Sequence, residues 1–381
     1  MQYIKRIIEK KLAEYIRNFP AVYITGPRQS GKSTMIQQLL SKDYQYVTFD
    51  DMRIVNLLQD DPERFMSIYN NRIIFDEVQK VPEIFPLLKR HIDKDRQNYG
   101  KFILTGSNQL ILHEKVTESL AGRIGILELL PFQVAELPQK CRPESLFKGS
   151  YPELVMRDYR AWQDWYASYV DTYINKDVRQ LSNIGDLRDF RRLLMLLSAN
   201  VSQQLNMSTL ANNIGVSVPT VKRWISILES AFIIFLLPPF YKNLGKRITK
   251  SPKIYFYDCG LVSFLTGIET EKNFENGPLT GPLFENHVIS EIVKKEMHND
   301  SHCEFFYYKA SSGAEVDLIV DRHHSLDFFE IKSSYTFKPS MVKHLESFEK
   351  ESSSSFLLYR GESMPFTPDI KISNYREYLL S

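Results

Sequence analysis

The sequence has 381 residues, of which 43% are hydrophobic and 25% are charged. This composition is typical of a globular protein, and the length predicts roughly two to three domains. The formal net charge is only +2. A chain so nearly neutral has no overall positive field that would attract nucleic acid, so any such partner would have to be held by a local basic patch.

The sequence also argues against a disulfide scaffold, a secretory leader and a membrane span. Cys141, Cys259 and Cys303 are too scattered for a disulfide framework or a zinc knuckle, which favours a reducing compartment. Residues 1–16 are interrupted by charges and predict an amphipathic helix instead of a signal peptide. The longest apolar stretch, residues 231–240, contains two prolines and has about half the length that a membrane span needs. We therefore expect a cytoplasmic protein without a membrane partner.

The segment GPRQSGKST, residues 26–34, lies between an apolar run and an apolar-periodic stretch, where a strand is expected to pass into a helix. It matches the pattern G-x-x-x-x-G-K-[ST] in full. A glycine-rich turn that opens a helix leaves backbone N–H groups pointing one way, with the positive end of the helix dipole behind them, and so forms a seat for an anion. An accidental loop with a capping serine fits this context less well. We predict that the loop binds ATP through Gly26, Pro27, Arg28, Gln29, Ser30, Gly31, Lys32, Ser33 and Thr34.

Three further short β segments follow, at residues 44–50, 72–79 and 101–108, and helical patterns separate them. This alternation predicts a parallel sheet covered on both faces, with ligands at the carboxyl ends of the strands. In the second of these segments, Asp76 and Glu77 directly follow the apolar residues 73–75. We predict that Asp76 holds Mg²⁺ together with Ser33, and that Glu77 orients the attacking water. The alternative is that the acidic pair merely caps the next helix.

Four segments together carry a resemblance to a known family: GPRQSGKST, IIFDEVQ, ILTGSN and LAGRIGILELLPFQVAEL. The chain resembles the bacterial and archaeal AAA-like ATPases that carry a C-terminal domain of unknown function. The resemblance covers nearly the whole chain. It implies an α/β fold class: a P-loop NTPase domain with a parallel sheet, then a helical lid, a winged-helix domain and a C-terminal α/β restriction-endonuclease-like domain.

The resemblance also implies two catalytic groups beyond the phosphate loop. In that family the strand ending in TGSN resembles a sensor strand, whose polar tip responds to the γ-phosphate, and the candidates here are Ser107 and Asn108. Arg123 resembles the family's recurring arginine, a finger or sensor that neutralises charge in the transition state. The alternative for Arg123 is an ordinary surface ion pair with Glu118 or Glu128. Such ATPases commonly form rings, but a single sequence does not distinguish a homo-oligomer from a monomer.

Three helical patterns and a β-hairpin pattern then predict a winged helix. The helices are expected near residues 191–205, 207–215 and 217–231, with a turn at Gly215 and an N-cap at Ser217. A local basic patch accompanies them, although protein docking or a merely solvated face remains an alternative. We predict DNA contacts from Thr220, Lys222 and Arg223 on the last helix, and from Lys242, Lys246, Arg247, Lys250 and Lys253 on the wing.

A second candidate site lies near the C-terminus. Two predicted strands, residues 315–320 and 327–333, carry Asp317 on one and Glu330 and Lys332 on one face of the other, and an amphipathic helix upstream carries Glu285. This set resembles the restriction-endonuclease-like fold. In such enzymes the carboxylates, here Asp317 and Glu330, bind Mg²⁺, and the lysine assists the attacking water. The pattern is loose, and domains of this kind often keep the fold for binding without cleavage.

These predictions divide the chain into an ATPase domain (residues 1–135), a helical lid or linker (136–185), a winged helix (186–258) and a restriction-endonuclease-like domain (259–381). The predicted function is Mg²⁺-dependent ATP binding and hydrolysis, coupled to DNA binding. The sequence leaves open whether the C-terminal domain also cleaves nucleic acid with a metal ion. The alternative is a slow ATP-dependent switch whose winged helix and inactive nuclease-like fold dock a protein partner.

Overall fold

The structure, a computed structural model, describes residues 3–106, 119–174, 187–240, 251–310, 313–348 and 353–381. Several predicted site residues lie outside these ranges: Ser107, Asn108, Lys242, Lys246, Arg247 and Lys250. The chain divides into two units. The first comprises residues 1–132, 230–232 and 297–300, and the second comprises the remainder.

The first unit is built on a sheet of five parallel strands in the order β2-β3-β4-β1-β5. Its strands are β1 (Ala21–Thr25), β2 (Gln45–Thr48), β3 (Ile73–Asp76), β4 (Phe102–Thr105) and β5 (Ile124–Glu128). The four β segments expected in this region are therefore present, and the P-loop strand β1 lies between β4 and β5. The α/β fold class predicted for this part of the chain is confirmed.

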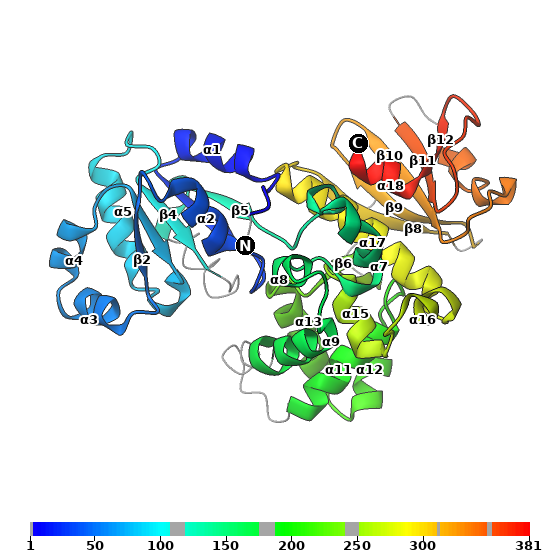
Figure 1. Ribbon diagram of the computed structural model, residues 1–381, viewed down its shortest axis with the longest axis horizontal. Coiled ribbons are helices and arrows are strands. Elements are labelled where there is room, and N and C mark those ends of the chain that lie inside the picture. Colours follow the sequence, from blue (N-terminus) through cyan, green and yellow to red (C-terminus); the bar gives the residue numbers. More distant parts are fainter. Residues whose placement is uncertain (1–2, 107–118, 175–186, 241–250, 311–312, 349–352) are drawn as a thin grey trace. The chain divides into compact units, whose positions relative to one another are not determined.

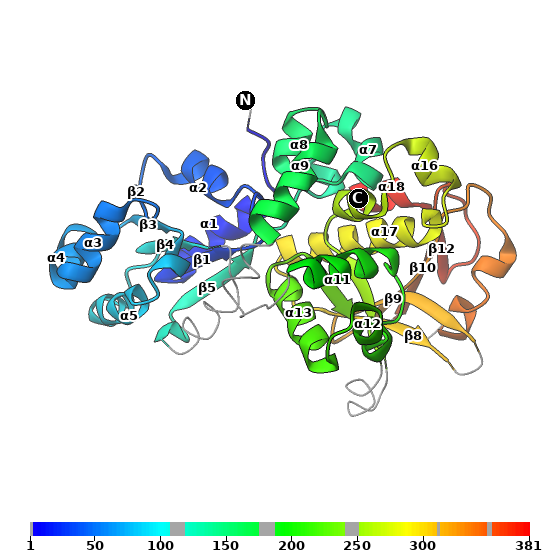
Figure 2. The same cartoon turned by 90° about the horizontal axis from the view of Figure 1, so that it is seen from below.

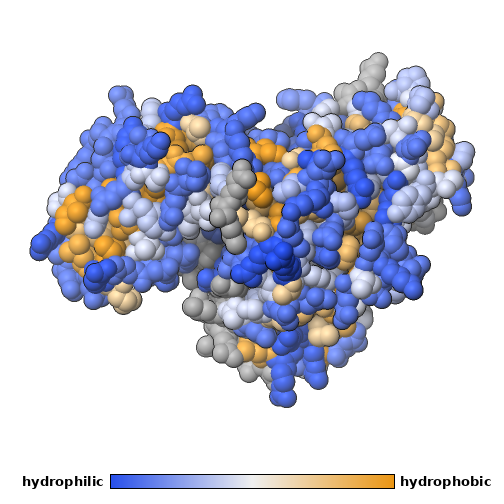
Figure 3. Space-filling model, viewed as in Figure 1, coloured by the Kyte–Doolittle hydropathy of each residue, from blue (hydrophilic) through white to orange (hydrophobic). Residues whose placement is uncertain are grey.

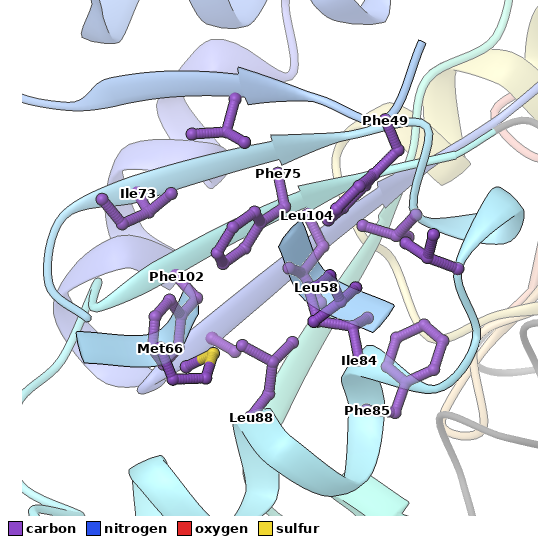
Figure 4. Close-up of a cluster of buried hydrophobic side chains, with 14 of the residues drawn as sticks. Phe49, Leu58, Met66, Ile73, Phe75, Ile84, Phe85, Leu88, Phe102 and Leu104 are labelled. Atoms are coloured by element: carbon purple, nitrogen blue, oxygen red, sulfur yellow. The ribbon is translucent and has the colours of Figure 1, made fainter. Parts of the chain in front are cut away.

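Helices cover both faces of this sheet, and Figure 1 labels these helices. They are α1 (Glu9–Asn18), α2 (Lys32–Leu40), α3 (Met52–Asp60), α4 (Pro62–Ile68) and α5 (Ile84–Lys94), with a 3₁₀ turn η1 (Val78–Lys80). Successive strand residues point to opposite faces. Val22 and Ile24 accordingly pack with α1 and α2, whereas Tyr23 packs with α3, α4 and α5. Figure 4 shows other side chains of this second cluster, among them Phe75, Phe102 and Leu104. Burial on both faces explains why these strands read as continuous apolar runs.

The first helix begins later than the sequence indicates. The charged pattern predicts a helix over residues 1–16, but α1 runs over Glu9–Asn18. Arg6 lies ahead of it and is 3% exposed, with its guanidinium bonded to backbone carbonyls of distant segments. Those tertiary contacts hold the preceding residues out of the helix.

The second unit begins with short helices and continues with three helices and a hairpin. The short elements are η2 (Val134–Glu136), η3 (Gln139–Cys141), α7 (Arg142–Lys148), α8 (Pro152–Met156), α9 (Trp162–Tyr169) and the π-helix η4 (Val170–Ile174). Then come α11 (Leu187–Ala199), α12 (Met207–Ile214), α13 (Val218–Ser230) and an antiparallel pair, β6 (Ile234–Leu237) and β7 (Lys253–Phe256). Gly215 ends α12 in the left-handed conformation, and the Ser217 hydroxyl accepts a hydrogen bond from the Thr220 N–H at 3.3 Å, as the predicted caps require. The order of elements is the one that the sequence predicts for this region.

The C-terminal part of the second unit contains a mixed five-stranded sheet in the order β12-β11-β10-β9-β8. Its strands are β8 (Glu304–Lys309), β9 (Glu315–Asp321), β10 (Leu326–Lys332), β11 (Ser353–Tyr359) and β12 (Ile370–Asn374). The helices are α15 (Cys259–Thr266), α16 (Glu271–Asn276), α17 (Thr280–His298) and α18 (Tyr375–Leu380), with 3₁₀ turns η5 (Pro339–Met341) and η6 (Leu345–Phe348). Figure 2 shows α17 and α18 lying close together, and the rings of Phe284 and Tyr375 join them at 4.9 Å. Both strands expected here, at residues 315–320 and 327–333, are present as β9 and β10, and they pair antiparallel.

The visible surface is largely hydrophilic (Figure 3). Exposed large apolar side chains include Met52 on α3 and Ile68 on α4. The three cysteines are free thiols. Within the described ranges, no helix combines the length and the apolar character needed to cross a membrane.

Candidate nucleotide-binding site and acidic cluster

The two glycines of the phosphate loop have backbone conformations and surroundings that exclude a side chain. Gly26 has a φ of +141°, and a Cβ placed on it would stand 2.1 Å from the Leu129 carbonyl oxygen. Gly31 has a φ of +91° and forms the N-cap of α2. Left-handed conformations of this kind are favourable for glycine alone among the common residues. The pattern G-x-x-x-x-G therefore has a steric cause at both ends of the loop.

Lys32 is nearly buried and is held by its own loop. Its side chain is 7% exposed, and the ammonium Nζ donates to the carbonyl oxygens of Gly26 at 3.0 Å and Pro27 at 2.8 Å. These carbonyls keep a positive charge at the base of the loop, next to the N-terminus of α2. An ammonium in this position and a helix N-terminus both favour an anionic ligand. Elsewhere in the loop, Arg28 is half-buried and Thr34 is exposed.

Asp76, at the end of β3, is the centre of a hydroxyl network. The carboxylate is 5% exposed and accepts hydrogen bonds from the Ser33 Oγ at 3.0 and 3.1 Å, from the Tyr46 hydroxyl and from the Thr105 Oγ1. Burial and the neighbouring Asp76 carboxylate raise the pKa of Tyr46. The donors come from α2, β2 and β4. Because β4 lies between β1 and β3, the phosphate-loop helix and the acidic strand meet across it.

Glu77 follows in a strained backbone conformation. Its φ of 60° and ψ of 42° lie in the left-handed region, which costs a residue with a side chain on the order of 1–3 kcal/mol and is characteristic of functional sites. Its N–H donates to the Thr105 Oγ1 at 3.4 Å, and the Gln79 amide donates to its carboxylate. Glu77 precedes η1 but makes no side-chain capping bond to it. The interpretation of this glutamate as a mere helix cap is therefore not supported.

Arg123 does not lie at this site. It precedes β5 at the amino end of the strand, whereas the phosphate loop follows the carboxyl end of the parallel strand β1. The five residues of β5 separate the two edges by about 16 Å. The Arg123 guanidinium forms a forked pair with Asp93 of α5, at 2.6 and 3.1 Å. The structure thus shows an ion pair for Arg123, with a partner other than the two glutamates considered from the sequence.

The second unit brings together all four of the residues proposed from the C-terminal pattern. Glu285 comes from α17, Asp317 from β9, and Glu330 and Lys332 from β10. The Lys332 Nζ lies 3.5 Å from Asp317 Oδ2 and pairs with Glu330. The Ile331 N–H donates to Asp317 Oδ2 at 2.8 Å. We call these four residues, together with Lys253 and Glu315, the acidic cluster.

Lys253 corrects one of the sequence predictions. It was expected among the cations of an exposed basic wing, but it lies on β7 and is 4% exposed. Its Nζ is 2.7 Å from Glu315 Oε1, 3.3 Å from Glu285 Oε1 and 3.9 Å from Asp317 Oδ1. Because its ammonium is buried among three carboxylates, Lys253 is unable to contact a nucleic acid.

The acidic cluster has a perturbed charge state. Burial, reinforced by repulsion from Asp317 and opposed by Lys253, raises the pKa of Glu285 to about 7. Burial and Asp317, opposed by Lys332, likewise raise the pKa of Glu330 to about 8, and the Glu330 Oε2 is buried without a hydrogen-bond partner. The carboxylates raise the pKa of Lys253 and of Lys332 against the opposing effect of burial. In the described part of the chain, no three or more His, Cys, Asp or Glu side chains are grouped so that they could hold a metal ion.

The helix α13 presents part of the predicted DNA-binding set. Lys222 and Arg223 are exposed, whereas Val221 and Trp224 face the core. The Thr220 hydroxyl lies 2.8 Å from the Ser217 hydroxyl, so it belongs to the cap of the helix. Two cations on this helix are therefore accessible to a partner.

Sequence reasoning missed Tyr46 and Thr105 at the first site and the role of Lys253 at the second. Thr105 had a readable signal, because it ends a strand that was already expected to reach the ligand edge. Tyr46 and Lys253 had none. Each lies on a strand and contacts a residue about 30 positions away in the sequence, Asp76 for Tyr46 and Glu285 for Lys253.

A parallel sheet with a glycine-rich loop after β1 and an acidic pair after β3 defines the class of P-loop NTPases. Comparison with known proteins agrees: residues 18–138 match the family described as AAA domain, residues 141–272 match a domain of unknown function, and residues 280–378 match a second domain of unknown function. Residues 18–138 are thus an AAA domain, which confirms the resemblance to P-loop AAA-like ATPases with a C-terminal domain of unknown function over the matched segments.

Similar proteins occur in bacteria and archaea. An uncharacterized protein of Mycobacterium tuberculosis is 29% identical over 348 residues, which cover 90% of this chain and 76% of the relative. An uncharacterized protein of Methanocaldococcus jannaschii is 26% identical, over 83% of this chain and 75% of its own length. Among solved structures, a Walker-type ATPase of Pyrococcus abyssi is similar with a TM-score of 0.48 and 16% identity, covering 69% of this chain and 96% of that one.

Proposed function

We propose that this protein binds ATP with Mg²⁺ at the phosphate loop and hydrolyses it. The observation that carries the proposal is the meeting of Lys32 and Ser33 with Asp76 and Glu77 at the carboxyl edge of the first sheet. A cation-binding pair, an ammonium and a strained glutamate there supply the parts that phosphoryl transfer to water requires.

Each side chain has a defined part in this chemistry. The Ser33 hydroxyl and the Asp76 carboxylate, 3.0 Å apart, are hard oxygen ligands of the type that Mg²⁺ prefers, and they would hold the ion. When bound, the ion neutralises charge on the outer phosphates. Lys32 exchanges its two carbonyl partners for phosphate oxygens, and Glu77 accepts a hydrogen bond from the attacking water and orients it. The Asn108 expected to sense the γ-phosphate stays a prediction.

The decisive experiment separates binding from hydrolysis. In the full chain, Lys32→Ala is expected to abolish binding of a fluorescent ATP analogue measured with Mg²⁺, whereas Glu77→Gln keeps binding and stops phosphate release. Lys42→Ala is the matched control, because Lys42 is an exposed lysine just beyond the same helix. If Lys32→Ala binds and hydrolyses ATP like the parent, the assignment is wrong.

We further propose that the second unit binds DNA. The support is the pair of exposed cations, Lys222 and Arg223, on the third helix of a three-helix and hairpin arrangement of the kind that places a helix in a groove. Fluorescence anisotropy with a short duplex should show salt-dependent binding. Replacing both cations by alanine should lower the slope of log K against log salt by about 0.9 for each phosphate that the protein no longer neutralises. An unchanged slope would favour a protein as the partner of this helix.

Cleavage of nucleic acid is a separate question, posed by the acidic cluster. Its support is the convergence of Glu285, Asp317, Glu330 and Lys332. Lys253 weighs against it, because this ammonium already neutralises the carboxylates that a metal would need. A plasmid-nicking assay with Mg²⁺ or Mn²⁺ should compare the parent with Asp317→Ala. Equal background in both proteins would reject cleavage and leave a binding role for this fold.

A further inference from the structure

A buried arginine ahead of the first helix links the phosphate loop to the end of the first unit. Arg6 is 3% exposed. Its Nη1 donates to the Ser30 carbonyl oxygen at 2.9 Å, and its Nη2 donates to the Leu130 carbonyl oxygen at 2.7 Å and lies 3.5 Å from that of Pro131. The guanidinium also stands 4.6 Å from the ring centroid of Phe132. One side chain therefore contacts the loop and three consecutive residues that follow β5.

The contact with Ser30 bears directly on the anion seat. Ser30 lies between two residues in the left-handed region, Gln29 and Gly31, whose φ angles are 65° and 91°. In a trans peptide the C=O and the next N–H point in opposite directions. Arg6 holds the Ser30 carbonyl toward the protein interior. The Gly31 N–H consequently points away from Arg6, at the N-terminus of α2, where a phosphate would be received.

The second guanidinium nitrogen of Arg6, Nη2, holds the segment through which the chain leaves this unit. We call residues 129–132 the exit segment, because the second unit begins at Gln133. The Leu129 N–H donates to the Thr25 carbonyl oxygen at 2.8 Å, and the Leu129 carbonyl occupies the space beside Gly26. The exit segment is therefore packed against both ends of the loop: directly at Gly26 and through Arg6 at Ser30.

Only an arginine can make this link. Its planar guanidinium presents donors in a fixed fork and stays charged at any physiological pH, so it can serve two carbonyls on different segments at once. A lysine keeps the charge but offers a single point of contact on a flexible stem. Comparing Arg6→Lys with the parent therefore tests the forked hydrogen bonding of the guanidinium separately from its positive charge.

We infer that Arg6 is a positioning residue that couples occupancy of the phosphate loop to the exit segment. The inference rests on the proposed binding of ATP. When phosphates engage the Gly31 N–H, the Ser30–Gly31 peptide is held in its present orientation, which favours the arrangement in which Arg6 also holds Leu130 and Pro131. Binding and an ordered exit segment then favour each other, as linkage requires.

Hydrogen exchange measured by mass spectrometry on the full chain tests this coupling. In the parent, a nonhydrolysable ATP analogue with Mg²⁺ should slow exchange both in the phosphate loop and in the exit segment, where the Leu129 and Leu130 amides are hydrogen-bonded. In Arg6→Lys, protection of the loop should persist, while the effect of nucleotide on the exit segment should fall at least threefold. Arg17→Lys, an exposed arginine on α1, is the control and should behave like the parent.

A second variant keeps the test decisive if Arg6→Lys does not fold. Phe132→Leu removes the ring beside the guanidinium but leaves the carbonyl partners of Arg6, and it should weaken the nucleotide effect in the same direction. An undiminished nucleotide effect on the exit segment in the variants that fold overturns the inference, as does a parent that is protected in the loop alone. Absence of any protection in the parent loop would instead overturn the proposed function, and the coupling with it.

Discussion

The two units each gather carboxylates, a lysine and a tyrosine hydroxyl, but they use the charges differently. At the phosphate loop Asp76 is held by hydroxyl groups, and Lys32 is held by carbonyls of its own loop. In the acidic cluster, the ammonium groups of Lys253 and Lys332 are paired with the carboxylates. Hydrogen bonds from neutral hydroxyl groups do not cancel the charge of Asp76, whereas the ion pairs of the acidic cluster largely neutralise its carboxylates. The first site is therefore prepared for a charged ligand, and the second is largely neutralised by its own side chains.

The largest expected effect is at Glu77. Glu77→Gln should lower the rate of ATP hydrolysis by about 10²–10⁴-fold, because a neutral amide does not polarise the attacking water as a carboxylate does and can present its NH₂ group to the water instead of an acceptor. Phosphate release at saturating ATP measures this. Glu83→Gln, an exposed glutamate nearby, should hydrolyse ATP at the parent rate. If Glu77→Gln hydrolyses ATP at the parent rate, Glu77 is not catalytic, and the two sites do not differ in this respect.

The next largest effect is at Lys253. Lys253→Met should destabilise the second unit by about 3–5 kcal/mol near pH 8, because it removes the buried ammonium that Glu285, Glu315 and Asp317 share. Urea unfolding followed by intrinsic fluorescence measures the decrease, with the exposed Lys272→Met as a control expected to stay within about 0.5 kcal/mol of the parent. If Lys253→Met is as stable as the parent, the cluster does not depend on its own ammonium groups, and the two sites are more alike than their geometry indicates.

The pH dependence of stability should sharpen the same contrast. A carboxyl group whose pKa is raised on folding keeps its proton in the native state while the unfolded chain has lost it, so its contribution falls as the pH rises. For Glu330, with a pKa raised from 4.5 to about 8, stability of the second unit should decline as the pH rises between these values. Glu330→Gln should flatten this decline in urea titrations at several pH values. An equally steep decline in Glu330→Gln would assign it to other groups.

The smallest effects concern the two tyrosine hydroxyls. Tyr46→Phe removes one of the donors to Asp76 and should lower ATP hydrolysis by no more than about tenfold, since Ser33 and Thr105 remain. Tyr255 donates to Glu285 at 2.6 Å, and Tyr255→Phe should instead cost about 0.5–1.5 kcal/mol of stability in the second unit. Steady-state ATP hydrolysis and urea unfolding of both variants would distinguish the sites. The comparison would be contradicted if Tyr255→Phe lowered ATP hydrolysis and Tyr46→Phe affected only the stability of the second unit.

Much of the first site could be predicted because its signals are local. The spacing of Gly26, Gly31, Lys32 and Ser33 is fixed by one turn of chain, and Asp76 and Glu77 are placed by the end of one strand. The confirmed α/β class follows from the alternation of apolar runs and helical patterns. Arg123 shows the limit of such reasoning: its motif is clear, but the parallel sheet carries it to the opposite edge and pairs it with Asp93.

The acidic cluster was predicted in part for the same reason. Strand spacing places Glu330 and Lys332 on one face of β10, and the pairing of β9 with β10 brings Asp317 beside them. The place of Lys253 was not readable, because its neighbourhood in the sequence is rich in exposed-type cations. Lys253 neutralises charge because it is buried against three carboxylates, and the residues next to it in the sequence do not indicate this burial.

The sequence by itself determined the phosphate loop, the acidic pair after β3 and the helical and strand elements that carry them, because turn geometry and residue periodicity act over a few neighbouring residues. Only the tertiary structure decided which charges meet. Arg6 reaches Ser30 and Leu130, Tyr46 reaches Asp76, and Lys253 reaches Glu285 and Glu315. Electrostatic and hydrogen-bond partners are set by distance in space, and that distance is fixed by strand order and packing, which a linear pattern does not contain.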